Sequence, residues 1–78
     1  MREQIPLAMV PPGRVVRIIS INVKGRGPYR RLLELGLIPG SMVRVVSNAL
    51  GPVVIEKNGV RFAIGRGHAS RIIVEIIG

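Results

Sequence analysis

The sequence lacks most of the side chains on which catalytic and metal sites depend. Its 78 residues include no cysteine, no aspartate and a single histidine, His68. Without cysteine there is neither a disulfide nor a thiolate metal site. Ser70 lies close to His68, but the chain has no aspartate to complete a catalytic triad. Tight metal sites use three or four ligands, and only Glu56 or Glu75 could join His68. We therefore expect no catalytic, cofactor-binding or metal-ligating residues, and a protein that is not an enzyme.

Long hydrophobic runs are absent as well. A membrane-spanning helix needs about 20 apolar residues, and charges or prolines interrupt every candidate segment of this chain. The apolar stretch at residues 5–10 is too short for a secretory signal and contains a proline. We therefore expect a cytoplasmic protein with no membrane span.

Basic and β-branched residues dominate the sequence. Twelve Lys and Arg residues stand against four Glu residues, which gives a net charge of +8, while 47% of all residues are hydrophobic. Such an apolar content argues against disorder, and a chain of this length forms one domain with a thin margin of stability. We expect a single domain over residues 1–78, in which residues 1–4 are a short flexible tail.

Clusters of β-branched residues predict five short strands. These strands are residues 14–23, 42–47, 53–57, 60–64 and 71–77. The first alternates irregularly, which indicates a β-bulge. Asn58-Gly59 favours a type I′ turn between the third and fourth strands, in a register that places Glu56 opposite Arg61. The proline-broken residues 5–13 fit neither a regular helix nor a central strand, so we expect an extended segment across the core.

One short helix is predicted between the first two strands, at residues 29–35. Pro28 suits its first position, and Gly36 is placed to end it in a left-handed conformation with Leu37 folding back onto it. Residues 65–70 form a connector of about one helical turn, in which His68 is exposed. Many strands in a short chain favour a closed barrel, because closure removes exposed edges. We therefore expect a mainly β fold, a small SH3-like barrel of about five strands with one short inserted helix.

The positive charge is concentrated before Glu34. Six of the twelve cations lie between Glu3 and Glu34, a span that holds no acidic residue. We expect Arg30 and Arg31 in the first turn of the helix, where the helix dipole disfavours positive charge. An anion docking near residues 24–31 would relieve that conflict. The alternative is that this charge run is only a solvated face.

Nucleic acid is an obvious acidic partner for so basic a chain, since small basic barrels do bind it. Against this, the only aromatic residues are Tyr29 and Phe62, and Phe62 is expected in the core. Proteins that bind single strands stack bases on several aromatic side chains. Non-specific binding to a duplex needs only phosphate contacts, so a basic nucleic-acid-binding barrel remains the alternative function.

The segment RLLELGLIPG, residues 31–40, resembles the signature of the FeoA family, small accessory proteins of bacterial and archaeal ferrous iron transport. Pro12-Gly13 before the first strand and Gly59 in the hairpin fall where that family's pattern puts them. The resemblance covers nearly the whole chain and implies an SH3-like barrel. It also implies a non-enzymatic protein that docks on the cytosolic side of an FeoB-type ferrous iron transporter and modulates uptake. The basic segment 24–31 departs from the family pattern.

The docking surface is placed on this basic loop and helix, where charge would steer the encounter and an apolar contact would hold it. Its candidate residues are Arg26, Tyr29, Arg30, Arg31 and Leu33. The protein would then lie at the inner face of the membrane through its partner. A third interpretation is a domain that senses metal directly, which would need iron affinity from Glu and His alone. Unpaired strand edges also leave a homo-oligomer open.

Overall fold

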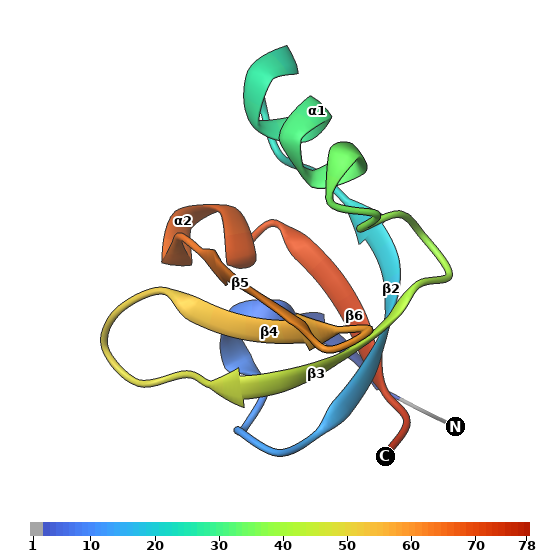
Figure 1. The fold of residues 1–78 in the computed structure, drawn as a ribbon, viewed down its shortest axis with the longest axis vertical. Helices are drawn as coiled ribbons and strands as arrows, with labels where there is room; N and C mark the ends of the chain where they lie inside the picture. The colour runs from blue at the N-terminus through green and yellow to red at the C-terminus, as the bar shows by residue number, and fades with distance from the viewer. Residues whose placement is uncertain (1–2) are drawn as a thin grey trace.

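Six strands form one antiparallel sheet in the part of the chain described by this computed structural model, residues 3–78. Their order in the sheet is β1-β6-β2-β3-β4-β5. The strands are β1 (Gln4–Pro6), β2 (Val15–Ile21), β3 (Met42–Ser47), β4 (Val53–Lys57), β5 (Val60–Ile64) and β6 (Ile72–Ile76). The sheet curls around one hydrophobic core (Figure 1). β1 and β5 are its two edges, and no pairing between them is seen over residues 3–78, so the closure that we expected is incomplete.

Three short helical segments interrupt the strands. They are the 3-10 helix η1 (Leu7–Met9), the helix α1 (Arg26–Glu34) between β2 and β3, and the helix α2 (Arg66–Ala69) between β5 and β6. None of the helices within the described range is long and apolar enough to cross a membrane. The architecture is thus mainly β with one inserted helix of several turns, as the sequence predicts.

The start of the chain contributes a strand that we did not predict. Gln4, which we assigned to the tail, begins β1 and pairs with Glu75 of β6. Pro6 is tolerated because β1 is an edge strand, where a missing N–H costs no ladder hydrogen bond. η1 follows at once and turns Leu7 and Val10 into the core. Residues 1 and 2 of the predicted tail lie outside the described residues.

The hairpin is confirmed in register and in turn type. Asn58 and Gly59 both have positive φ, 53° and 79°, as a type I′ turn requires. Glu56 pairs with Arg61, whose Nε lies 3.1 Å from the Glu56 Oε2. The predicted irregularity in the first strand is confirmed too, because the pairing of β2 with β6 shifts between Ile18 and Ser20.

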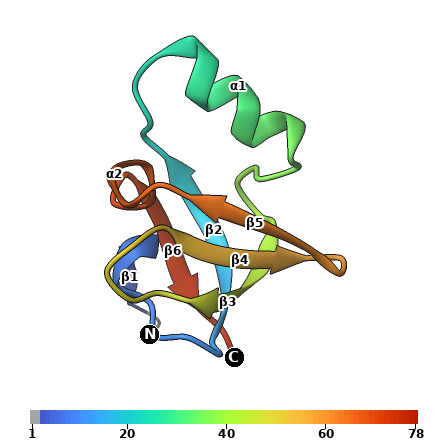
Figure 2. The same cartoon turned by 60° about the vertical axis from the view of Figure 1, so that its left-hand side comes forward.

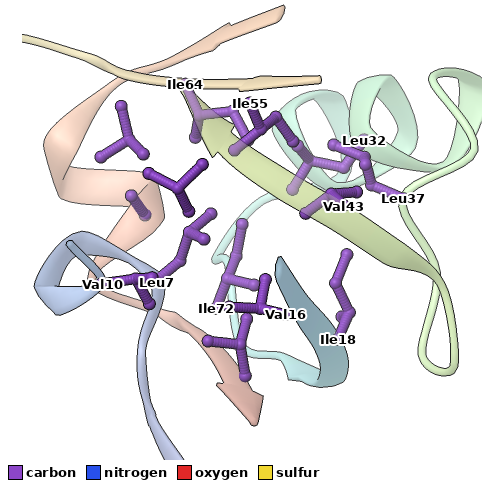
Figure 3. Packing of buried hydrophobic residues seen from close by; sticks show 14 of the residues in the cluster. Leu7, Val10, Val16, Ile18, Leu32, Leu37, Val43, Ile55, Ile64 and Ile72 are labelled. Atoms are coloured by element: carbon purple, nitrogen blue, oxygen red, sulfur yellow. The ribbon is translucent and has the colours of Figure 1, made fainter. Parts of the chain in front are cut away.

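The core consists of inward-facing residues of the strands together with a few residues from the connecting segments. Val43 and Val45 of β3 are buried while Met42 and Arg44 are exposed, so successive side chains of this strand alternate between the core and solvent. No polar or charged side chain in residues 3–78 is fully buried. Figure 3 shows Leu32 and Leu37 at the α1 side of the cluster. Folding therefore depends on aliphatic packing, in agreement with the composition.

Candidate functional site

The helix α1 stands away from the sheet on one side of the molecule (Figure 1). It begins at Arg26, three residues earlier than predicted, so that Pro28 falls in its first turn, where a missing N–H does no harm. Among the residues of α1 only Leu32 is buried. The helix is therefore attached to the core by one side chain, and most of its surface faces solvent.

The C-terminal end of α1 is held more firmly than its start. Gly36 takes φ +80°, its N–H donates to the Leu33 carbonyl at 2.9 Å, and the Leu37 N–H donates to the Leu32 carbonyl at 2.9 Å. These two bonds form the predicted left-handed cap, with Leu37 fully buried. The Gly36 carbonyl also accepts hydrogen bonds from Lys57 Nζ at 2.7 Å and from Ser41 Oγ at 2.9 Å. The cap thus fixes the direction in which α1 leaves the barrel.

A cleft of about 480 Å³ separates α1 from the end of β5 and from α2. Apolar side chains and charged side chains from segments far apart in the sequence meet there. The apolar lining includes Leu32, Leu35, Ala63 and Ile64, and the polar lining includes Arg30, Arg31, Glu34 and His68. The combination suits a ligand that is partly apolar and carries negative charge.

The two arginines of the cleft differ in their partners. Arg30 Nε lies 3.6 Å from the Glu34 Oε1, and both side chains are largely exposed, so this ion pair is weak. The Arg31 side chain makes no hydrogen bond or ion pair with any residue between 3 and 78. Arg31 is therefore the cation of this cleft that is most available to a partner.

The predicted docking residues divide between two faces of α1. Arg30 and Arg31 line the cleft, whereas Arg26, Tyr29 and Leu33 do not. These three recur at helical spacing and so share another face of the helix, and Arg30, four residues after Arg26 and three before Leu33, borders both faces. Tyr29 and Leu33 are large side chains left 37% and 40% exposed. All five residues are accessible, but one partner surface would have to wrap around the helix to touch them all.

Our prediction that Arg30 and Arg31 lie in the first turn of the helix is wrong. Because α1 begins at Arg26, Arg31 falls in the last turn, where the helix dipole favours positive charge. Arg26 occupies the first turn instead, and no acidic residue accompanies it there. The expected conflict with the dipole therefore concerns Arg26 alone.

Sequence reasoning missed the opposite wall of the cleft. Ala63, Ile64 and His68 lie about thirty residues after α1, and only the folding of the sheet brings them near it. His68 is exposed on α2, as expected of a connector residue. No local sequence signal could have linked these residues to Arg31, since the contact depends on how the whole sheet curls.

Arg66, a half-buried arginine, fixes the position of α2 and therefore of the cleft wall opposite α1. The Arg66 guanidinium donates to the Asn48 Oδ1 and to the carbonyls of Ala8 and Ala49. Asn48 Nδ2 in turn donates to the carbonyls of Ala8 and Val10, each at 2.8 Å. These bonds join η1, the β3–β4 loop and α2. The cleft therefore has one rigidly tied wall and one wall, α1, that is attached through its end.

Within residues 3–78, no three His, Cys, Asp or Glu side chains gather closely enough to hold a metal ion. The accessible features of the site are thus the charged helix and the apolar cleft. A curled six-stranded sheet with a helix between its second and third strands is the fold of a small SH3-like barrel protein. The FeoA domain model matches residues 5–76, and the chain belongs to the FeoA family.

Known relatives agree with this assignment. A protein of Methanocaldococcus jannaschii, provisionally named Fe(2+) transport protein A, is 41% identical over 70 residues, which cover 90% of this chain and 84% of the relative. A crystal structure of the iron uptake regulatory protein FeoA is 34% identical, with a TM-score of 0.85 over 96% of this chain and 100% of that one. The resemblance noted in the sequence is confirmed.

A third relative is described by its fold. FeoA of Stenotrophomonas maltophilia, crystallised with zinc, is called a procaryotic SH3 domain protein. It is 26% identical, with a TM-score of 0.74, and the match covers 95% of this chain and 88% of that one. The expected SH3-like barrel is thereby confirmed.

Proposed function

We propose that this protein is a non-enzymatic accessory factor of ferrous iron transport that docks on the cytosolic side of an FeoB-type transporter and modulates uptake. Membership of the FeoA family supports the transport context. The M. jannaschii relative is named for Fe(2+) transport, and the S. maltophilia relative is suggested to act as a ferrous iron transport activating factor. In this proposal the protein is cytoplasmic and reaches the inner face of the membrane only through its partner.

The observation that carries the docking proposal is the exposure of α1. A helix with one buried residue leaves nearly all of its surface to a partner. Tyr29 and Leu33 are large side chains that remain exposed. Tyrosine is a common anchor in protein interfaces, and Leu33 would add apolar contact beside it. The arginines around them would steer the approach of an acidic partner. The proposed docking residues are Arg26, Tyr29, Arg30, Arg31 and Leu33.

A matched pair of charge reversals tests this proposal. Arg31→Glu removes a cation from the cleft, where the side chain has no ion-pair partner among the described residues. Arg14→Glu makes the same change of net charge just before β2, at the end of that strand remote from α1 (Figure 1). Arg14 gives up only an exposed hydrogen bond to the Gly78 carbonyl.

Binding of each variant to the cytosolic part of the transporter is measured by pull-down and by titration at two salt concentrations. We expect Arg31→Glu to weaken binding about fivefold or more, equivalent to about 1 kcal/mol, while Arg14→Glu changes it little. Both variants should melt close to the parent protein. If the two variants weakened binding equally, the loss would follow from the change in net charge alone, and this result would contradict the proposed surface. A large fall in the melting temperature of Arg31→Glu would instead assign Arg31 a structural role.

The exposed cations also fit the alternative of a basic barrel that coats nucleic acid. Phosphate contacts release counterions, so such binding falls steeply as salt rises. Duplex DNA titrated over a salt series, beside the pull-down, separates the two functions. Micromolar, salt-sensitive DNA binding without capture of the transporter would replace the docking proposal.

A further inference from the structure

The strand β5 lies at an edge of the sheet, and its open side faces α1. Within residues 3–78 β4 is its only neighbour in the sheet, and in two views that differ by 60° α1 lies beyond β5 on the side away from β4 (Figures 1 and 2). The cleft between them is lined by Ala63, Ile64 and Gly65 on one side and by α1 on the other. This part of the cleft is a channel between an edge strand and a helix, and we refer to it as the channel. It lies beside the open edge of β5.

The turn determines which backbone groups of β5 are unpaired. In a type I′ turn the carbonyl of the first residue, Lys57, accepts from the N–H of the fourth, Val60, so these two form a hydrogen-bonded pair. Directly opposed pairs alternate along an antiparallel ladder between bonded and non-bonded. Arg61 and Ala63 are therefore in non-bonded pairs, and their N–H and C=O groups point away from β4. No residue between 3 and 78 makes a backbone hydrogen bond to either of them from the open side.

We infer that β5 accepts an extended, acidic segment of a partner protein as an additional strand in this channel. Ala63, which lines the channel, and Arg61, which lies beyond its lining, offer donors and acceptors two residues apart, the spacing at which an added strand pairs. Alternate side chains of the added strand would meet the apolar lining, where Leu35 and Ile64 lie. Those between them would carry carboxylates toward Arg30 and Arg31. This inference deepens the proposed function and rests on it for the partner's identity.

The positive charge of the chain favours an acidic segment over a second copy of the chain as the occupant of the channel. Two copies joined edge to edge would bring together two molecules of net charge +8, and like charges across an interface oppose association. Arg61 on the open edge acts in the same direction, since a cation on an edge strand discourages pairing between identical edges. An acidic strand carries negative charge, so the same cations would attract it.

The test uses a synthetic peptide of eight residues that alternates glutamate and valine and is blocked at both ends. Amide hydrogen exchange of the full chain is followed by NMR with and without the peptide. We expect the Arg61 and Ala63 amides to exchange quickly in the free protein and at least tenfold more slowly at saturation. The Phe62 amide, which points to β4, is the internal control and should change little.

Two control peptides separate strand pairing from simple charge attraction. Methylation of alternate backbone nitrogens keeps the charge but removes the donors, and it should abolish the protection at Arg61 and Ala63. Replacement of glutamate by lysine should abolish binding. Binding of the first peptide without protection of these two amides, or no binding at millimolar concentration, would overturn the inference. Protection that grows with the concentration of the protein alone would identify a second copy as the occupant and overturn it too.

The failure of this inference and that of the proposed function can be told apart. If the cytosolic part of the transporter binds the chain while the Arg61 and Ala63 amides stay unprotected, docking stands and strand addition is refuted. If the peptide protects both amides but no transporter binding is found, the channel is an acidic-strand site and the proposed partner is wrong.

Discussion

Leu32 is the residue that attaches α1 to the core, so its truncation measures how far the candidate site depends on one contact. The side chain is 5% exposed, whereas that of its neighbour Leu33 is 40% exposed. Both leucines lie in the same helix, one residue apart, and replacing either by alanine changes helix propensity equally. The pair Leu32→Ala and Leu33→Ala therefore isolates burial from every other property of the substitution.

The expected loss is large relative to the total stability of the domain. A buried leucine replaced by alanine loses about 2–5 kcal/mol, from lost transfer energy and from the cavity left behind. A domain of 78 residues has a free energy of unfolding of about 4–12 kcal/mol, at 0.05–0.15 kcal/mol per residue. A loss of about 3 kcal/mol would lower the melting temperature by roughly 12–24 °C. Leu33→Ala should cost less than about 1 kcal/mol because its side chain is already partly in water.

Urea unfolding followed by far-ultraviolet circular dichroism gives both free energies, and amide exchange of α1 shows whether the helix detaches first. We expect Leu32→Ala to speed exchange throughout α1 more than in β4, because the helix has no second buried anchor of its own. Equal losses for the two alanine variants would refute the reasoning. So would a Leu32→Ala variant whose stability matches the parent, since α1 would then be held by something other than this contact.

Two further substitutions test the elements that frame the cleft. Gly36→Ala should cost about 1–2 kcal/mol in urea unfolding, because φ is +80°, and Lys57 Nζ would have to move away from the new Cβ and from its hydrogen bond to the Gly36 carbonyl. Gly67→Ala in α2, which has a negative φ and no neighbouring atom within 4 Å, is the control and should be neutral or stabilising. Arg66→Ala should cost about 1–3 kcal/mol, because it leaves the Ala49 carbonyl and the Asn48 amide oxygen without their donor and removes one of the two donors to the Ala8 carbonyl. A fully stable Arg66→Ala variant would show that the loop and α2 are held by packing alone.

The features that the sequence determined are those whose physical cause is local. Asn58-Gly59 specifies a hairpin because both residues adopt positive φ at low cost, and a two-residue loop then leaves one register. Gly36 ends α1 for a similar reason, since only glycine takes its left-handed conformation without strain. The alternation in β3 and the β-branched strands likewise follow from neighbouring residues. These local signals also carry the family signature, so the amino-acid sequence alone predicts both the fold class and the family.

Tertiary structure decided the rest, because the remaining features join segments that the sequence leaves unrelated. The residues that start the chain become β1 only because β6 offers them an edge. Helix α1 begins at Arg26 rather than later, which moves Arg31 from the first turn to the last and changes its electrostatic role. Most of all, the cleft exists because the curl of the sheet brings the end of β5 under α1. Packing over long sequence separations sets that curl, and no local pattern of residues encodes it.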